Sequence, residues 1–388
     1  MNDKMKKPIR RFPEHSDMTP PKTYLKNTVS LCKKEKHIHF NQYQWQYFTI
    51  ESLEDDNTFS ILCASGQTAN SQTILVSLDN GNTWEEKTAS SGGTEIFTLN
   101  TNQKALIKSN TWKPNANNNY EYTIRCRFIA NNAYKIYGNI LSLVYGDNFL
   151  GKNTLNNIAR TFQYLFYKSI NLKDASNLVL NATTLTAYCY YYMFAGCTNL
   201  TTAPELPATT LASHCYQSMF YGCSNLLTAP SALPALTLYG GCYQGMFEEC
   251  RSLTAAPELP ATTIASSCYI DMFRFCTSLK TGPTILPALT LYDNCYRRMF
   301  RFCNNLENAP ILPAPILVTY CYHHMFDGAN KINHVKCLAN SGFETEDCIT
   351  NWLLNTSSTG TFVKAQGVEW PSGVSGIPDG WTVEEEAV

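Results

Sequence analysis

The chain has few charged residues for its length. Lys, Arg, Asp and Glu make up 16% of its 388 residues, and the formal net charge is -1. Soluble proteins are on average about 25% charged, so a whole-chain electrostatic attraction to nucleic acid or to acidic membrane is excluded. No apolar run comes near the ~18 residues of a membrane span. We therefore expect neither nucleic-acid binding nor membrane insertion.

The first 40 residues also lack the apolar segment of a secretory signal peptide. They hold ten Lys or Arg and four Asp or Glu, a charge of +6, which leaves 20 against 27, or -7, for the rest. We expect residues 1–40 to be a basic extended arm that lies on other structural subunits. The missing leader favours a phage virion part assembled in the host cytoplasm. The alternative is a bacterial cell-surface protein whose leader is absent from this sequence.

What is abundant is an internal repeat. The block Cys-Tyr-x-x-Met-Phe recurs every 26 or 27 residues, and each block except the sixth is followed by a second cysteine and then by a leucine three residues on. A weaker copy precedes the first block, with Leu165-Phe166 in place of Met-Phe. About seven units are therefore predicted over residues 147–335. The six blocks begin at Cys189, Cys215, Cys242, Cys268, Cys295 and Cys321.

Each unit is predicted to contain a short helix and a short strand. Leu211, Cys215, Met219 and Cys223 lie four residues apart, which indicates one apolar stripe on a helix. The segment LTTAPELP that begins at 200 is closed by prolines and is typical of a brief strand with a turn. A strand, a turn and a helix in each short repeat predict an α/β leucine-rich-repeat solenoid, in which stacking completes the core.

The patterns MFYGCSNLLTAP and MFEECRSLTAAPELPATT resemble the BspA-like class of bacterial leucine-rich repeats. The resemblance covers residues 160 to 335. It implies a repeat solenoid and a surface adhesin or other recognition module. The repeats differ from the usual form in being longer and richer in proline.

The segments on either side have different compositions. Residues 41–146 contain alternating β-rich runs such as TFSILC and TILVSL, which predict an antiparallel β-sandwich. The run SLDNGNTW from Ser77 to Trp84 matches an Asp box, a motif that resembles those of sialidases and other glycan-handling proteins. Residues 336–388 are predicted to form a C-terminal cap made of strand, helix and strand, with Trp352 and Leu353 on the helix.

No catalytic, metal or cofactor site is predicted. Eleven of the 16 cysteines occupy repeat positions, where they are expected to be buried free thiols. Cys32, His37 and His39 form the one compact set of possible metal ligands, and we assign no metal to it. Glu205 and Glu258 are 53 residues apart, and duplication of a paired repeat accounts for both.

The pair of residues after each Cys-Tyr varies between repeats, and these positions are expected to face outward. Toward the C-terminal end, arginines at these positions and directly after Met-Phe predict a basic patch. The candidate ligand-binding residues from these rows are Tyr191, Tyr192, Arg274, Arg297, Arg298, Arg301, His323 and His324.

Two functions remain open. The first is a non-catalytic recognition or structural protein of a phage virion, as a tail or capsid-decorating part, or of a bacterial surface, which displays the repeats to a host glycan or protein. The alternative is a carbohydrate-active, glycosidase-like enzyme that uses the β-domain. The first is favoured, because sialidase chemistry needs an arginine cluster and a tyrosine nucleophile that the sequence does not place. Self-association into a homo-oligomer is left open.

Overall fold

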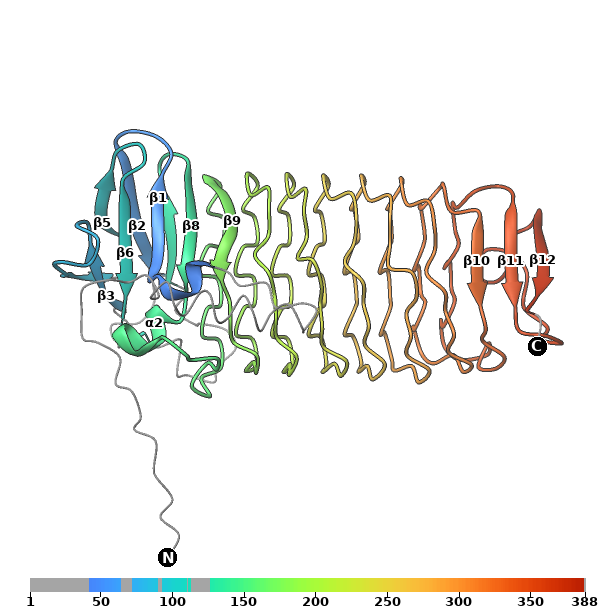
Figure 1. Cartoon of the computed structure of the whole chain (residues 1–388). Helices are drawn as coiled ribbons and strands as arrows, with labels where there is room; N and C mark the ends of the chain where they lie inside the picture. Colours follow the sequence, from blue (N-terminus) through green and yellow to red (C-terminus); the bar gives the residue numbers. More distant parts are fainter. Residues whose placement is uncertain (1–41, 64–71, 90–92, 110, 113–125, 387–388) are drawn as a thin grey trace, which may run out of the picture.

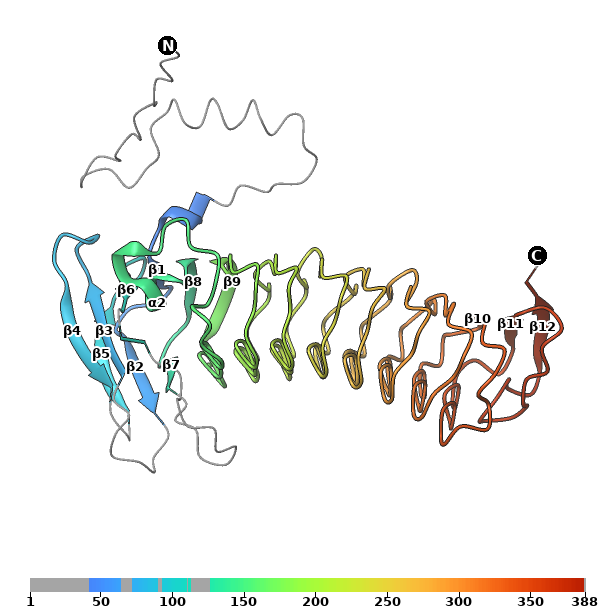
Figure 2. The same ribbon diagram turned by 90° about the horizontal axis from the view of Figure 1, so that it is seen from below.

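The protein is elongated and rich in β-structure (Figure 1). A β-sheet unit lies at the N-terminal end, a stack of coils follows, and a small sheet lies at the C-terminal end (Figures 1 and 2). The basic arm lies outside the described residues. This computed structural model describes residues 42–63, 72–89, 93–109, 111–112 and 126–386. The helical segments among them are η1 (Gln42–Trp45), α2 (Ser142–Tyr145) and η2 (Gly146–Asn148).

The N-terminal strands form two sheets. One has the strand order β4-β3-β6-β1-β8-β9 and the other has the order β5-β2-β7. All neighbours in both sheets are antiparallel except β8 and β9, which run parallel. The bounds are β1 (Phe48–Ser52), β2 (Asn57–Cys63), β3 (Gln72–Ser77), β4 (Glu85–Ala89), β5 (Thr94–Leu99), β6 (Lys104–Lys108), β7 (Cys126–Ala130), β8 (Tyr134–Asn139) and β9 (Leu172–Val179).

The two sheets face each other through aromatic side chains. The Phe48 ring of β1 lies 5.8 Å from the Phe128 ring of β7, and the Phe59 ring of β2 lies 5.2 Å from the Tyr134 ring of β8. The antiparallel strands expected from the sequence are present, whereas β4 and β8 were not expected. Strand β9 comes from the repeat region, so the larger sheet continues directly into the coil stack.

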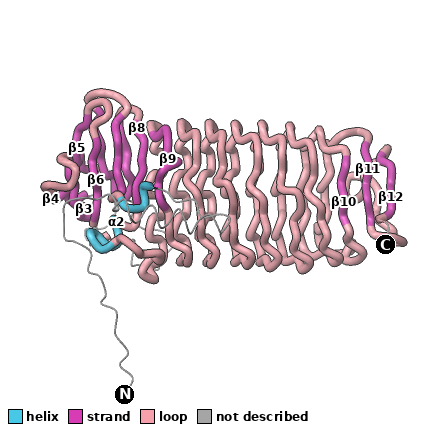
Figure 3. The backbone as a smooth tube through the Cα atoms, viewed as in Figure 1, coloured by secondary structure: helices cyan, strands magenta, loops and turns pink. Residues whose placement is uncertain are grey.

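The predicted helix of each repeat is wrong. Residues 188–197 and their equivalents form a chain of consecutive turns, and no helix occurs in the described part of the stack (Figure 3). Neighbouring coils are joined by backbone bonds across this segment. The Tyr190 N–H, for example, donates to the Cys215 carbonyl of the next coil at 2.9 Å. Coil-to-coil hydrogen bonding therefore replaces the internal hydrogen bonding of a helix.

Ladders of identical side chains fill the interior of the stack. One ring follows another from Tyr190 to Tyr322 at centroid distances of 5.5 to 6.0 Å. A second aromatic ladder runs from Phe166 to Phe326 at 5.3 to 5.6 Å. These rings are almost completely buried. No coil covers its own apolar face, so the coils depend on their neighbours.

The predicted strand of each repeat is reduced to isolated bridges. Thr202 pairs with Thr228, and Ala255 pairs with Thr281, but no strand is formed at these positions. Prolines such as Pro204 and Pro207 follow directly. A proline has no N–H to donate to a ladder, so pairing stops after one or two residues.

Strand β7 closes the N-terminal end of the stack. The Phe128 N–H donates to the Leu165 carbonyl of the first coil at 2.8 Å. The Trp112 indole donates to Thr161 at 2.9 Å, and Arg127 donates to the Tyr167 carbonyl at 2.8 Å. The β-sheet unit thus satisfies carbonyls that would otherwise face an absent coil.

The C-terminal end contains one more coil than predicted. The expected helix at Trp352 and Leu353 is wrong, because residues 347–356 repeat the turn pattern of the preceding coils. Trp352 stacks under Tyr322 at 6.0 Å and on Trp370 at 5.6 Å, so Trp370 ends this ladder. A parallel sheet of order β10-β11-β12 lies beside it. Its strands are β10 (His334–Cys337), β11 (Gly360–Lys364) and β12 (Trp381–Glu385).

Candidate functional site

The outward residues predicted from the sequence lie on a ribbon of turns with a four-residue period. In residues 188–197, alternate N–H groups donate to the next coil, and the others donate three residues back, as Met193 does to Tyr190 at 3.1 Å. Two residues point inward and the next two point outward. Within the described residues, eight coils carry this ribbon, at 160–169, 188–197, 214–223, 241–250, 267–276, 294–303, 320–329 and 347–356.

Every fourth residue of the ribbon has left-handed backbone geometry. Tyr188, Tyr192 and Gly196 have φ values of 58°, 53° and 75°. A residue other than glycine costs roughly 1–2 kcal/mol in this conformation. The backbone at these positions is therefore held in this conformation by the stack, at a cost that coil-to-coil bonding offsets.

A cluster of tyrosines occupies the N-terminal part of the outward rows. We call it the tyrosine patch. Tyr191 and Tyr192 contact each other at 4.5 Å between ring centroids, and Tyr192 also stacks on Tyr164 at 5.4 Å. Most of these rings are partly exposed, and Tyr164 is buried beneath them. The members are Tyr164, Tyr167, Tyr188, Tyr191, Tyr192 and Tyr221.

Cations border the tyrosine patch. The Arg160 guanidinium lies 4.8 Å from the Tyr188 ring centroid, and the Lys168 ammonium lies 5.3 Å from that of Tyr167. The patch therefore combines rigid aromatic faces, hydroxyl groups and positive charge at its edge.

Three of the four arginines of the predicted basic patch are paired with carboxylates of neighbouring coils. Arg298 pairs with Asp271 at 2.7 Å, and Arg301 pairs with Asp327 at 2.9 Å. Arg274 likewise pairs with Glu248 at 3.1 Å. This pairing was not foreseen because the acidic residues come from adjacent coils, 26 or 27 residues away in the sequence, and fall into the same rows.

Arg297 has a different environment. Its guanidinium lies 5.1 Å from the Tyr320 ring centroid and donates to the Asn294 side chain at 3.2 Å. Arg297 is thus held by the Asn294 amide of its own coil and by the Tyr320 ring of the next coil.

Glu248 is the acidic residue of these rows whose pKa departs most from its usual value. Burial, with the nearby Asp271 carboxylate, raises the pKa of Glu248 to about 7, and the Arg274 guanidinium opposes this only in part. The side chain is 15% exposed. Glu248, at the N-terminal end of this charged row, is therefore close to gaining or losing a proton near neutral pH.

His323 and His324 lie side by side, with ring centroids 4.4 Å apart. Burial, together with His324 and Arg297, lowers the pKa of His323 to about 4, so this ring is neutral at pH 7. His324 bonds Asp327 through Nδ1 at 2.9 Å. His324 thus belongs to the paired network of Asp327, whereas His323 packs edge-on against the Tyr320 ring at 5.2 Å.

The Asp box is a closed turn of the β3–β4 hairpin. Asp79 accepts from the Thr83 N–H at 2.9 Å and from its hydroxyl at 2.7 Å, and these bonds, with one from Ser77, lower the pKa of Asp79 to about 2. The Trp84 indole donates to the Gly81 carbonyl at 3.1 Å. The motif's polar groups are used within the turn itself.

Glu205 and Glu258 each contact the coil that follows, and the two contacts are equivalent. Glu205 accepts from the Ser231 hydroxyl at 2.6 Å, and Glu258 accepts from the Thr284 hydroxyl at 2.9 Å. Each carboxylate bridges to the following coil, as duplication of a 53-residue unit requires.

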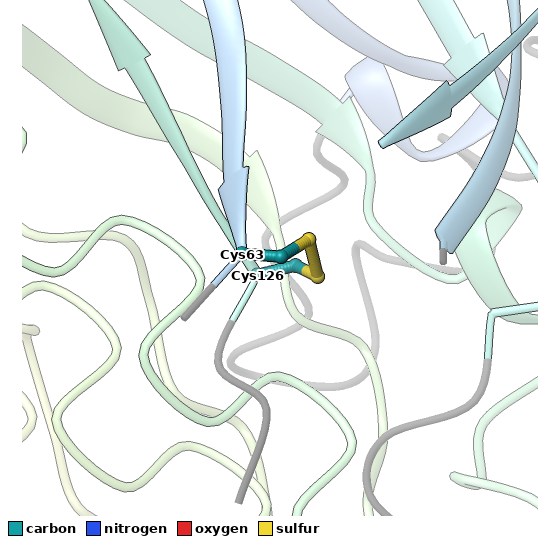
Figure 4. Close-up of a disulfide and its surroundings, with 2 residues drawn as sticks. All are labelled: Cys63 and Cys126. Carbon is teal, nitrogen blue, oxygen red and sulfur yellow. A yellow bond between two sulfur atoms is a disulfide. The ribbon is translucent and has the colours of Figure 1, made fainter. Parts of the chain in front are cut away.

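The eleven ladder cysteines are free thiols, as predicted, and all are buried. The second cysteine of a repeat donates to a phenylalanine carbonyl of the preceding coil, as Cys223 does to Phe194 at 3.1 Å. Burial raises the pKa of the Cys215 thiol to about 12. The sequence did not predict the disulfide between Cys63 and Cys126, which joins β2 to β7 (Figure 4).

These thiols lead to a prediction. Denatured protein should show two more thiols with reductant than without, because only Cys63 and Cys126 are joined among the described residues. Native protein should expose none of the ladder thiols to a thiol reagent, because they are buried and protonated. The double variant Cys63→Ser/Cys126→Ser should abolish the difference. A loss of ten or more thiols without reductant would mean that the ladder is cross-linked.

No helix among the described residues is long and apolar enough to cross a membrane. The described residues also contain no group of three or more His, Cys, Asp or Glu placed to hold a metal, and Cys32, His37 and His39 lie outside them. The chain matches no protein-family model, no curated protein and no solved structure.

Proposed function

We propose that the protein is a non-catalytic recognition protein of a phage virion or a bacterial surface. Its tyrosine patch would bind a host glycan or protein. The observation that carries the proposal is the patch itself, where five partly exposed tyrosines from neighbouring coils meet around the buried Tyr164 on the outside of the stack. Tyrosine contributes a large contact area at a small entropic cost, and its hydroxyl adds hydrogen bonding.

The rest of the molecule supports recognition over glycosidase chemistry. The Asp79 carboxylate is engaged inside its own hairpin, and Glu205 and Glu258 are engaged by the next coil. We further propose that the repeats are a variant of the leucine-rich-repeat solenoid related to the BspA-like class, with the turn ribbon in place of the helix. The C-terminal sheet and Trp370 would be its cap. The basic arm would attach the protein to other structural subunits.

Binding to a glycan array, with host surface proteins as a second array, tests the proposal. The variant Tyr191→Ala/Tyr192→Gly should weaken binding at least tenfold, or about 1.4 kcal/mol. Glycine is chosen at 192 because φ is 53° there. Val383→Ala is the matched control, because Val383 is 45% exposed on β12, away from both the tyrosine patch and the stack of repeats that carries it. Ligand binding that survives in the patch variant would contradict the proposed site.

A further inference from the structure

A second outward surface of the stack is almost uncharged across six coils. We call it the threonine–leucine face. Its only charged residue is Asp293, at the last position of one coil. Coils are bridged along it, as between Thr184 and Thr210 and between Thr237 and Thr263. The face is made by residues 181–187, 207–213, 234–240, 260–266, 287–293 and 313–319.

Large apolar side chains stand exposed on this face. Leu236, Leu289 and Ile316 are 57%, 62% and 57% exposed, and Tyr239 and Tyr292 are 46% and 45% exposed. At roughly 200–250 Å² for a fully exposed side chain of this size, they present about 600 Å² of surface, the upper end for a patch on a monomer. The exposed threonines between them bring the face close to the ~800 Å² per partner of a stable dimer.

Large and small side chains alternate over the four coils from 207–213 to 287–293. Leu236 and Tyr239 lie on one coil, and the next coil has Thr262 and Ala265 at the same positions. The following coil has Leu289 and Tyr292 again. With coils ~4.8 Å apart, projections and recesses each repeat about every 10 Å.

We propose that the threonine–leucine face binds the same face of a second copy, with the two stacks antiparallel. A two-fold axis between the coil of Leu236 and the coil of Thr262 places every projection against a recess. Leu236 then lies over the partner's Thr262, and Leu289 lies over the partner's Thr209. A two-fold interface must be complementary to itself, and the alternation of residue size supplies that property.

The scarcity of charge selects this occupant over the others that the chain offers. The basic arm, with ten Lys or Arg, would find a single carboxylate, Asp293, on this face. An acidic lipid surface would find no cation. A second copy brings a face that is equally poor in charge, and in this register the exposed Asp293 lies over the partner's Ser213, so no two carboxylates meet on association.

Sedimentation equilibrium of the full chain at micromolar concentration tests the proposal. Wild-type protein should be a dimer, and Leu236→Asp/Leu289→Asp should raise the dimer Kd at least 100-fold. Leu236→Thr/Leu289→Thr, which copies the alternate coils and leaves the core intact, should also weaken the dimer. The matched control is Leu227→Asp, since Leu227 is 54% exposed outside the face. A monomeric wild type, or a dimer that both double variants leave unchanged, would overturn the proposal.

Cross-linking tests the antiparallel register. In a Cys32→Ser background, a Leu289→Cys chain mixed with a Thr209→Cys chain should give mixed dimers with a short bismaleimide. A Leu289→Cys chain alone should not cross-link to itself, and efficient self-linking would indicate parallel stacks and overturn the register. A chain lacking residues 1–40 should still dimerise; if it does not, the arm and not this face forms the interface.

Discussion

Met246→Asp is expected to unfold the coil stack. The Met246 side chain is fully buried between coils, and its carbonyl accepts the Phe220 N–H of the preceding coil at 2.9 Å. A carboxylate at this position has no partner and costs several kcal/mol. Because each coil is stabilised by its neighbours, the defect spreads along the stack. Differential scanning calorimetry should show a Tm lowered by roughly 10 °C or more, or loss of the cooperative transition.

Two controls separate the buried charge from other effects. Met246→Leu keeps the volume and apolar character and should cost less than about 1.5 kcal/mol. Thr254→Asp adds the same charge to the same coil at an exposed position outside the threonine–leucine face and should leave the melting curve nearly unchanged. A wild-type melting profile for Met246→Asp would mean that Met246 is not in the interior of the stack.

The inward-facing residues were predictable from the sequence, because identical side chains recur at fixed intervals. Cys215, Tyr216, Met219 and Phe220 all lie in the core, as a recurring apolar pattern indicates. In a stack of coils, residues one repeat apart become spatial neighbours. The ladders follow from this without knowledge of the local backbone.

The local backbone was not predictable from apolar spacing alone. Four residues are close to one helical turn, so the stripe indicated a helix. An α-helix advances 3.6 residues per turn, however, and a strict period of four drifts about 40° with each step. Gly222 and Gly245 are the signal that the helix prediction overlooked, because both occupy left-handed positions of the ribbon with φ of 68° and 58°.

The last coil was missed because its motif is altered. Cys348 follows Cys321 by 27 residues, which continues the spacing, but Ile349 and Trp352 replace the usual tyrosine and methionine. The closure of the first coil by β7 and the Cys63–Cys126 disulfide also could not be predicted. Both features depend on how segments far apart in the chain pair with each other.

The sequence predicted which positions form the outward rows, but not the rings and charges that surround each of them. Tyr191 and Tyr192 were predicted, while Tyr164, Tyr167 and Tyr221 come from adjacent coils and join them only in three dimensions. The prediction of a basic patch considered each arginine only within its own repeat. Each repeat's neighbours decide whether a charge is paired, as with Arg298 and Asp271.

Trp352→Ala should destabilise the C-terminal end of the stack selectively. Trp352 is fully buried between Tyr322 and Trp370, and its indole donates to the Gly376 carbonyl at 2.8 Å. Removing a buried tryptophan costs about 3–5 kcal/mol, and here it also leaves the Gly376 carbonyl without its donor. The end coils should open first, because an end coil has only one neighbouring coil. Hydrogen exchange should therefore speed up over residues 320–356 before it does over 188–223, whereas Trp352→Phe should retain most of the protection. Uniformly faster exchange along the whole stack would contradict this order, because it would mean that the coils open together and that the end has no separate closing role.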